Sequence, residues 1–178
     1  MNTTNVLRRL SPLALILIAL TALLAPTPSA RAQSSVPVQI RAHGTGDPSL
    51  AARAEFDGKV RFKADNNNDF RQRWQREQVT TGVFRFALAG TNSCIRIPNT
   101  LPAGDVAEIA VGSCSGTGAQ WRRVAVSGPG DYYRNVATSH HLSTDLCIFE
   151  TCSDKMFAMP GEWTSFLPDL PRITLEFL

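Results

Sequence analysis

The sequence predicts an all-β domain of short strands, on three observations. Apolar residues alternate with polar ones at a period of two, whereas a helix would require a period near 3.6. Clusters of Gly, Pro, Asn, Asp and Ser separate these stretches at short intervals. Three tryptophans, Trp74, Trp121 and Trp163, recur at spacings of 47 and 42 residues, which indicates three units of similar length. Short strands at regular spacing are typical of a barrel or a sandwich.

The first 32 residues are typical of a secretory signal peptide. A basic start with Arg8 and Arg9 precedes the apolar stretch LALILIALTALL, and Ala30 and Ala32 fit the small residues of a cleavage site. The apolar stretch is shorter than the roughly 20 residues that a bilayer core requires, so we expect no stable membrane insertion. We therefore predict cleavage near Ala32, a mature domain of residues 33–178, and a secreted or periplasmic location.

Removal of the signal peptide changes the charge balance. The 178-residue chain carries a formal net charge of +3, but residues 1–32 contain three arginines and no acidic residue. The mature domain is therefore formally neutral, which argues against a nucleic-acid partner. The basic cluster RQRWQR at 71–76 is flanked by acidic residues, so we interpret it as a solvated charged face.

Five stretches of the mature chain alternate most clearly and are predicted strands. Their apolar positions are Val60, Phe62 and Ala64; Phe84, Phe86 and Leu88; Ile109 and Val111; Val124 and Val126; and Ile173, Leu175 and Phe177. Successive side chains of a strand point to opposite faces, so these positions are expected to face the core. PSLAARAEF at 48–56 is the segment in which we expect a helical turn or two.

The first unit aligns with the second at an offset of 47 residues, the spacing of their tryptophans. This offset places Phe62 on Ile109 and keeps the strand phase, which decides the side chains that face the core. Asn67 then stands where the second unit has Cys114. The first unit is therefore expected to lack a pair of cysteines.

The second unit carries a family resemblance. CIRIPNTLPAGDVAEIAVGSCSGTGAQWRRV at 94–124 resembles one complete unit of the ricin B-type (QxW) β-trefoil family: a cysteine opens a strand, a second cysteine follows, and a short polar loop leads to a tryptophan. QRW at 72–74 matches the QxW signature. The resemblance implies a β-trefoil of three pseudo-repeats over 33–178, whose structural core includes Gln72, Trp74, Trp121 and Trp163. TTGVFRFALAGTNSCIRI at 80–97 also resembles the ricin-like subunits of cytolethal distending toxins.

Four cysteines, Cys94, Cys114, Cys147 and Cys152, lie in the exported part of the chain. An even number in an oxidising compartment favours two disulfides. Pairing within units would join Cys94 to Cys114 and Cys147 to Cys152, and would stabilise the fold by about 3 and about 2 kcal/mol. Crossed pairing stays open, because the sequence does not determine connectivity. Their spacing, without a nearby histidine, is poor for zinc, so we expect neither a metal nor a cofactor.

The resemblance also implies where a sugar would bind. The family's pocket uses an aspartate two residues after the first cysteine, an aromatic two before the second, and an asparagine three before the tryptophan. Carboxylate and amide groups bond vicinal hydroxyls, and an aromatic face covers the C–H side of the ring. The second unit has Arg96, Gly112 and Gly118 at these positions, and counting from Cys147 reaches Phe149 in the third. The pocket is therefore degenerate.

Several other residues are candidates for an altered pocket: Asn67, Asn68, Asp69, Tyr132, Tyr133 and Glu150. A turn is the competing interpretation of the asparagines, because Asn and Asp tolerate left-handed conformations. The histidines, His43 and the pair in SHHLSTD at 139–145, do not form a recognisable catalytic constellation. We therefore expect a binding module that is not an enzyme, with a glycan or glycoprotein as ligand, or a protein partner in a secreted, toxin-like complex.

Overall fold

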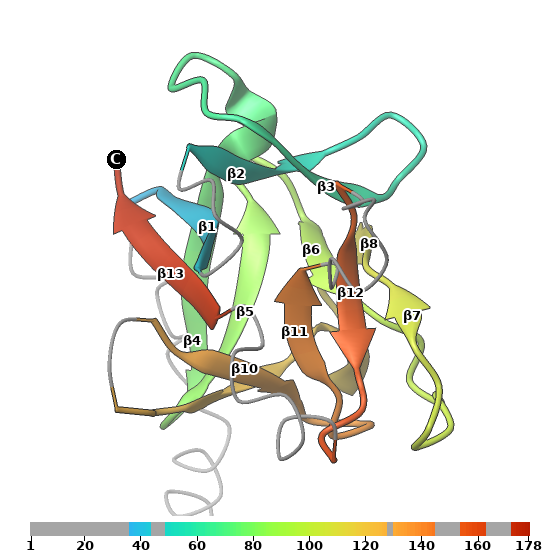
Figure 1. Ribbon diagram of the computed structural model, residues 1–178. Coiled ribbons are helices and arrows are strands. Elements are labelled where there is room, and N and C mark those ends of the chain that lie inside the picture. The colour runs from blue at the N-terminus through green and yellow to red at the C-terminus, as the bar shows by residue number, and fades with distance from the viewer. Residues whose placement is uncertain (1–35, 44–48, 128–129, 145–153, 163–171) are drawn as a thin grey trace, which may run out of the picture. The chain divides into compact units, whose positions relative to one another are not determined.

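The computed structural model describes residues 36–43, 49–127, 130–144, 154–162 and 172–178, which form strands joined by turns and two short 3-10 helices (Figure 1). The first unit contains β1 (Val38–His43), β2 (Leu50–Ala54), β3 (Val60–Ala64), η1 (Phe70–Gln72) and β4 (Trp74–Thr80). The second contains β5 (Val83–Leu88), β6 (Ser93–Arg96), β7 (Ala107–Glu108), β8 (Ala110–Ser113), η2 (Thr117–Ala119) and β9 (Trp121–Val124). The third contains β10 (Tyr132–Asn135), β11 (His141–Thr144), β12 (Met156–Met159) and β13 (Arg172–Phe177).

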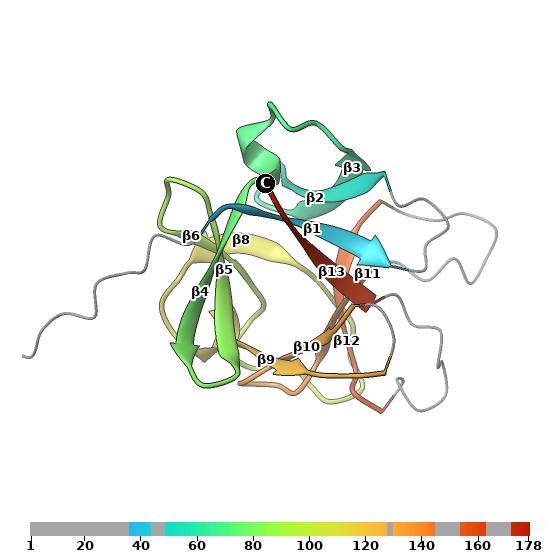
Figure 2. The ribbon, with the colours of Figure 1, turned by 90° about the vertical axis from the view of Figure 1, so that its left-hand side faces the viewer.

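Each unit uses its strands in the same way. The middle strands form antiparallel pairs, β2 with β3, β6 with β8 and β11 with β12. The last strand of one unit pairs with the first strand of the next, β4 with β5 and β9 with β10. β13 pairs with β1 from Val38↔Phe177 to His43↔Arg172, and the two lie side by side in both views (Figures 1 and 2). Three equivalent units arranged in this way form a β-trefoil, so the predicted fold class is confirmed.

Three residues mark the pseudo-threefold axis: Val60, Ile109 and Met156, each 0% exposed. The N–H of Val60 donates to the carbonyl of Ile109 (3.1 Å), and the N–H of Ile109 donates to the carbonyl of Met156 (2.9 Å). Their flanking residues are bridged in the same pattern, Lys59↔Ala110, Arg61↔Lys155 and Glu108↔Phe157. The three positions are therefore equivalent.

This equivalence corrects the sequence alignment by two residues. The tryptophan offset placed Phe62 on Ile109, whereas the structure places Val60 there. The prediction of which side chains face the core was nevertheless correct. Side chains of a strand alternate between its two faces, so a shift of two residues keeps each side chain on the same face. The cause is loop length: Trp74 follows Val60 by 14 residues, and Trp121 follows Ile109 by 12.

Trp74 and Trp121 begin β4 and β9, and both are 0% exposed. Their indole N–H groups donate to backbone carbonyls of the second strand of their own unit, that of Ala52 (2.9 Å) and that of Ile95 (3.2 Å). Gln72 is 1% exposed, and its side chain donates to the carbonyl of Ala64 (2.9 Å). These contacts fix where the last strand of the unit begins.

The third unit departs from the expected tryptophan period. The equivalent cross-strand pairs between units are Leu88↔Trp74, Asn135↔Trp121 and Ala42↔Ile173. By backbone register, Ile173 therefore holds the position of the two tryptophans. Trp163 itself lies outside the described residues, and it follows Met156 by only seven residues, half the distance between Val60 and Trp74.

Only the second unit has its cysteine pair at the positions that the family resemblance implies. Cys94 and Cys114 form a disulfide, as predicted. The residue equivalent to Cys94 in the third unit is His141, because Ala87↔Cys94 and Arg134↔His141 are matching pairs. Counting from Cys147 to find the pocket position of the third unit was therefore wrong, because Cys147 does not hold the position of Cys94. Cys147 and Cys152 lie outside the described residues.

Two local expectations were also wrong. Within the segment 48–56, Leu50–Ala54 forms β2 instead of a helical turn, because Ala51, Ala52 and Ala54 are buried and the strand pairs with β3. Tertiary pairing overrides the helical preference of alanine. Val124 and Val126 do not continue a core strand. β9 ends at Val124, and the inward position of Trp121 puts Val124 on the opposite face.

Candidate functional site

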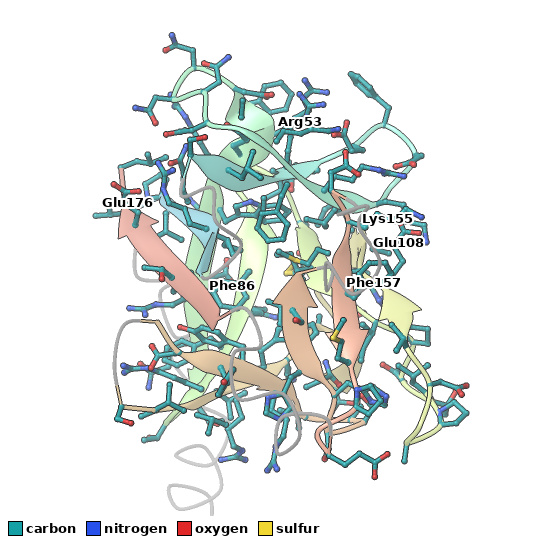
Figure 3. The ribbon with its side chains drawn as sticks, in the orientation of Figure 1. Arg53, Phe86, Glu108, Lys155, Phe157 and Glu176 are labelled. Atoms are coloured by element: carbon teal, nitrogen blue, oxygen red, sulfur yellow. A yellow bond between two sulfur atoms is a disulfide. The ribbon has the colours of Figure 1, made fainter. Side chains whose placement is uncertain are left out.

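A shallow pocket of about 350 Å³ lies on the hairpin that β2 and β3 form in the first unit. Its lining residues come from the two strands and from the turn between them: Arg53, Glu55, Phe56, Asp57, Arg61 and Lys63. Figure 3 shows Arg53 on this hairpin. We call it the hairpin pocket. None of its residues was among the candidates chosen from the sequence.

Phe56 is the most exposed large apolar residue of the described chain, at 93%. It lies in the β2–β3 turn, where the N–H of Gly58 donates to the carbonyl of Glu55 (3.1 Å) and Gly58 adopts a φ of 76°, a conformation that favours glycine. The guanidinium carbon of Arg71 lies 4.7 Å from the ring centroid, within range of a cation–π contact. The turn and Arg71 therefore hold an aromatic ring in solvent.

Ion pairs hold the charged groups around Phe56 in place. Arg53 donates to Glu55 (2.7 Å), Arg61 donates to Asp57 (3.0 Å), and Lys63 pairs with Asp154. Glu108, labelled in Figure 3, receives further ion pairs from Lys59 and Arg61. The hairpin pocket therefore presents both hydrogen-bond donors and hydrogen-bond acceptors, and ion pairs hold them in position.

Asp57 remains an acceptor over most of the pH range. The backbone N–H of Lys59 bonds to its carboxylate and, with nearby Arg61, lowers the pKa of Asp57 below its ordinary value. Its side chain is 53% exposed. A carboxylate that is ionised and open to solvent can accept hydrogen bonds from a ligand.

In the second unit, the position that corresponds to the hairpin pocket is occupied by a side chain of the protein, that of Arg96. The register makes Arg96 the equivalent of Arg53, and Gly112 the equivalent of Lys63. Arg96 lies across Gly112, where a Cβ would meet its Cδ at 2.9 Å. Gly118 is buried, and its N–H donates to Oδ1 of Asn99 (2.9 Å). The sugar pocket that the family resemblance implied is therefore closed here.

The loop of Asn67, Asn68 and Asp69 uses its polar groups internally. Asn67 accepts from Gln39 (3.3 Å) and from Arg73 through its carbonyl (2.6 Å), and the N–H of Asn68 donates to Oδ1 of Asn66 (3.0 Å). Asp69 caps η1 by accepting from the N–H of Arg71 (3.0 Å). These contacts favour the turn interpretation over a ligand site.

Two of the remaining candidates, Tyr132 and Tyr133, are neighbours on β10. Tyr133 is 0% exposed and packs edge-on against Phe86, with ring centroids 5.1 Å apart, so it cannot contact a ligand in the folded protein. Tyr132 points to the opposite face of β10 and contacts the ring of His141 at 5.6 Å. Glu150 and Phe149 lie outside the described residues.

The adjacent histidines His140 and His141 are both buried. Both ring nitrogens of buried His140 lie beside backbone carbonyl oxygens, of Thr138 (3.1 Å) and Asp105 (2.9 Å). His141 is 8% exposed, and its pKa is lowered to about 4 because burial penalises its charged form and Arg134 lies near. Within the ranges that the structure covers, no three His, Cys, Asp or Glu side chains gather in a way that could hold a metal ion.

The chain is similar in fold to several solved structures. The sequence matches no protein-family model and no curated protein. Among solved structures, the designed threefold-symmetric protein ThreeFoil is similar with a TM-score of 0.60 and 14% identity, over 78% of this chain and 97% of its own. A mosquitocidal holotoxin has a TM-score of 0.60 and 13% identity over 80% of this chain and 17% of its own. The chain therefore spans only a small part of that toxin.

A lectin from Polyporus squamosus, bound to a human-type influenza-binding epitope, has a TM-score of 0.50 and 11% identity over 70% of this chain and 49% of its own. Parts of several glycosidases match as well, and this chain spans 31% to 32% of each of them. At these identities the similarity shows a shared β-trefoil.

One sequence signal could have indicated the hairpin pocket. EFDGK at 55–59 places an aromatic between two acidic residues in a glycine turn that two strands enclose. A turn has no core to receive this ring. An aromatic at such a position is therefore exposed, beside carboxylates that the same turn presents.

Proposed function

We propose that the protein is an exported, non-catalytic β-trefoil module that binds glycans through the hairpin pocket. The observation that carries this proposal is Phe56, exposed at 93% among ion-paired arginines and carboxylates. Sugar sites require such a combination, because a pyranose presents hydroxyls at its rim and C–H groups on its faces. Its structural relatives include a lectin and a toxin, which agrees with this class of function.

Each group of the pocket has a part in this binding. The Phe56 ring covers the apolar face of a sugar, held in place by Arg71. Asp57 accepts from vicinal hydroxyls, while Arg53 and Arg61 donate to ring and hydroxyl oxygens. Because each of these charges already has an opposite partner, the pocket suits a neutral sugar better than a charged one.

A glycan array with matched variants tests this proposal. We expect wild type to bind a neutral glycan, and Phe56→Ala to weaken that binding by about tenfold, a loss of roughly 1.4 kcal/mol. Phe70→Ala is the control, because Phe70 is also exposed (62%) but does not line the pocket. Equal binding by wild type and Phe56→Ala would contradict the site, and glycoside hydrolysis by the purified protein would contradict a non-catalytic role.

A protein partner is the second candidate function. Phe56 and Phe70 are both exposed, and Arg71 follows Phe70 directly and covers the Phe56 ring. Aromatic and arginine side chains are the residues that most often dominate a protein interface. In this case both alanine variants would reduce co-purification of a second secreted protein, whereas a glycan site predicts that only Phe56→Ala has an effect.

We also propose that residues 1–32 are a signal peptide and that residues 33–178 form the exported domain. The Cys94–Cys114 disulfide is compatible with an oxidising compartment. In the part of the chain that the structure describes, no helix is long and apolar enough to cross a membrane. N-terminal sequencing of exported protein should give Gln33 as the first residue, and protein that retains Met1 outside the cytoplasm would contradict cleavage.

A further inference from the structure

The outer face of β9 and β10 carries two arginines directly opposite each other. Arg122 and Arg134 are cross-strand partners, and both are exposed. Their neighbours on the inward face, Trp121 and Tyr133, are 0% exposed, so strand alternation directs both arginines outward. β9 and β10 lie side by side at the lower edge of Figure 2. Two like charges on directly opposite residues of neighbouring strands repel each other and destabilise the strand pair.

Nothing in the described structure compensates this repulsion. No ion pair or hydrogen bond joins the side chain of Arg122 or Arg134 to another described residue, although other arginine side chains have such partners, for example Arg53, Arg61 and Arg123. Arg123 is the direct comparison, because it adjoins Arg122 and pairs with Asp131 at 2.7 Å. Among the described residues, an acidic side chain therefore pairs with Arg123, but none pairs with Arg122 or Arg134.

An aromatic side chain flanks the arginine pair. Tyr132 precedes Arg134 by two residues on β10, so it lies on the same face, opposite Val124. The ring of Tyr132 contacts that of His141, whose backbone pairs with Arg134 from the other side. Two guanidinium groups and one aromatic ring therefore share a small area of the sheet.

We propose that this face is a second binding site, for the acidic substituent of a glycan. Guanidinium groups match carboxylate and sulfate oxygens, and one oxyanion between Arg122 and Arg134 would replace repulsion by two attractions. The Tyr132 ring contacts the sugar that bears the substituent. Two cations form too small a cluster for an anionic membrane, where four to eight are typical, and the neutral domain offers no basic track for a nucleic acid.

This site is independent of the hairpin pocket. It lies on strands of the second and third units, and it selects charged rather than neutral sugars. Failure of one proposal therefore leaves the other intact, because Phe56→Ala and the arginine variants act on different ligands.

Three polymers with the same backbone test the proposal: dextran, carboxymethyl dextran and dextran sulfate. We expect the mature protein to bind one or both charged polymers and not dextran, and to bind more weakly as salt increases above about 0.15 M. Arg122→Gln and Arg134→Gln should each weaken binding by about tenfold. Arg123→Gln, which removes a charge that already has a partner, should change binding less than twofold, roughly the effect of a screened surface charge.

Arg134→Glu separates binding from folding. It places a carboxylate opposite Arg122, so it should raise the melting temperature and abolish binding to dextran sulfate. Three results would overturn the proposal: equal binding of dextran and its charged forms, unchanged binding after Arg122→Gln and Arg134→Gln, or capture by phosphatidylserine-containing vesicles without any binding to the charged dextrans.

Discussion

Oδ1 of Asn99 lies 2.9 Å from the backbone nitrogen of Gly118 and accepts its hydrogen bond. The asparagine side chain occupies the space that a side chain on Gly118 would need, and the carbonyl of Ile97 closes the other side, 2.5 Å from where a Cβ would stand. The residue that the lectin pattern requires at 118 is an asparagine. Here an asparagine already fills that space, but it comes from position 99.

Gly118→Asn should therefore destabilise the fold and create no sugar site. We expect a loss of about 1–3 kcal/mol, the range for inserting atoms into a packed region, measured by urea denaturation. Gly104→Ala is the matched control, since nothing lies within 4 Å of the position of its Cβ. A Gly118→Asn variant as stable as wild type would show that the Asn99 loop moves aside easily.

Trp121→Ala and Trp74→Ala should be equally damaging, each costing about 3–5 kcal/mol, because both indoles are fully buried and each donates a hydrogen bond to a backbone carbonyl. Thermal unfolding measures this loss. An unchanged melting temperature together with lost ligand binding would reverse the assignment of Trp121 from core to site.

Replacing Cys94 and Cys114 together by alanine should lower the free energy of unfolding by about 3 kcal/mol, because the disulfide closes a loop with a sequence separation of 20. Chemical denaturation of the double variant checks the value. The single Cys94→Ala variant leaves Cys114 free to react and is not a substitute. A double variant that matches wild type would place the stabilising cross-link elsewhere.

Stability should fall between pH 6.5 and pH 4 through His141. Its folded-state pKa of about 4 lies below the ordinary 6.5, so the unfolded chain binds more protons in this window, and the free energy of unfolding decreases as the pH falls. The full effect is on the order of 3 kcal/mol, from 1.36 kcal/mol for each unit of pKa difference. His141→Gln should flatten the dependence in this window when melting temperature is followed against pH. An equally steep profile would assign the effect to another group.

Alternation and period predicted an all-β domain of three units, and the resemblance to the ricin B-type family implied that these units form a β-trefoil. Val60 and Phe62 are buried as the two-residue pattern predicted, and Trp74 with Trp121 gave the length of a unit. The length of the loops between strands could not be predicted from the alternation or from the tryptophan spacing. The first unit has two more residues between the axis and its tryptophan than the second, so one offset could not align both strands and tryptophans.

The third unit shows where the sequence misleads. Trp163 and Cys147 look like markers of a repeat, whereas backbone pairing assigns the tryptophan position to Ile173 and the cysteine position to His141. Pairing register depends on contacts between distant segments, which a local pattern does not record. The candidate site was missed for a related reason: Phe56 stands alone in a turn of the sequence, and only the folded chain brings Arg61 of β3 and Arg71 of η1 beside it.

The pairing of β1 with β13 has a consequence for how the protein matures. Every residue from Val38 to His43 finds its partner between Arg172 and Phe177, so β1 emerges from the ribosome long before the strand that covers it. Contacts this distant in sequence form late and slow the folding of a β protein. A chain without Arg172–Phe177 therefore lacks the strand that pairs with β1, and the trefoil closes only once β13 has formed.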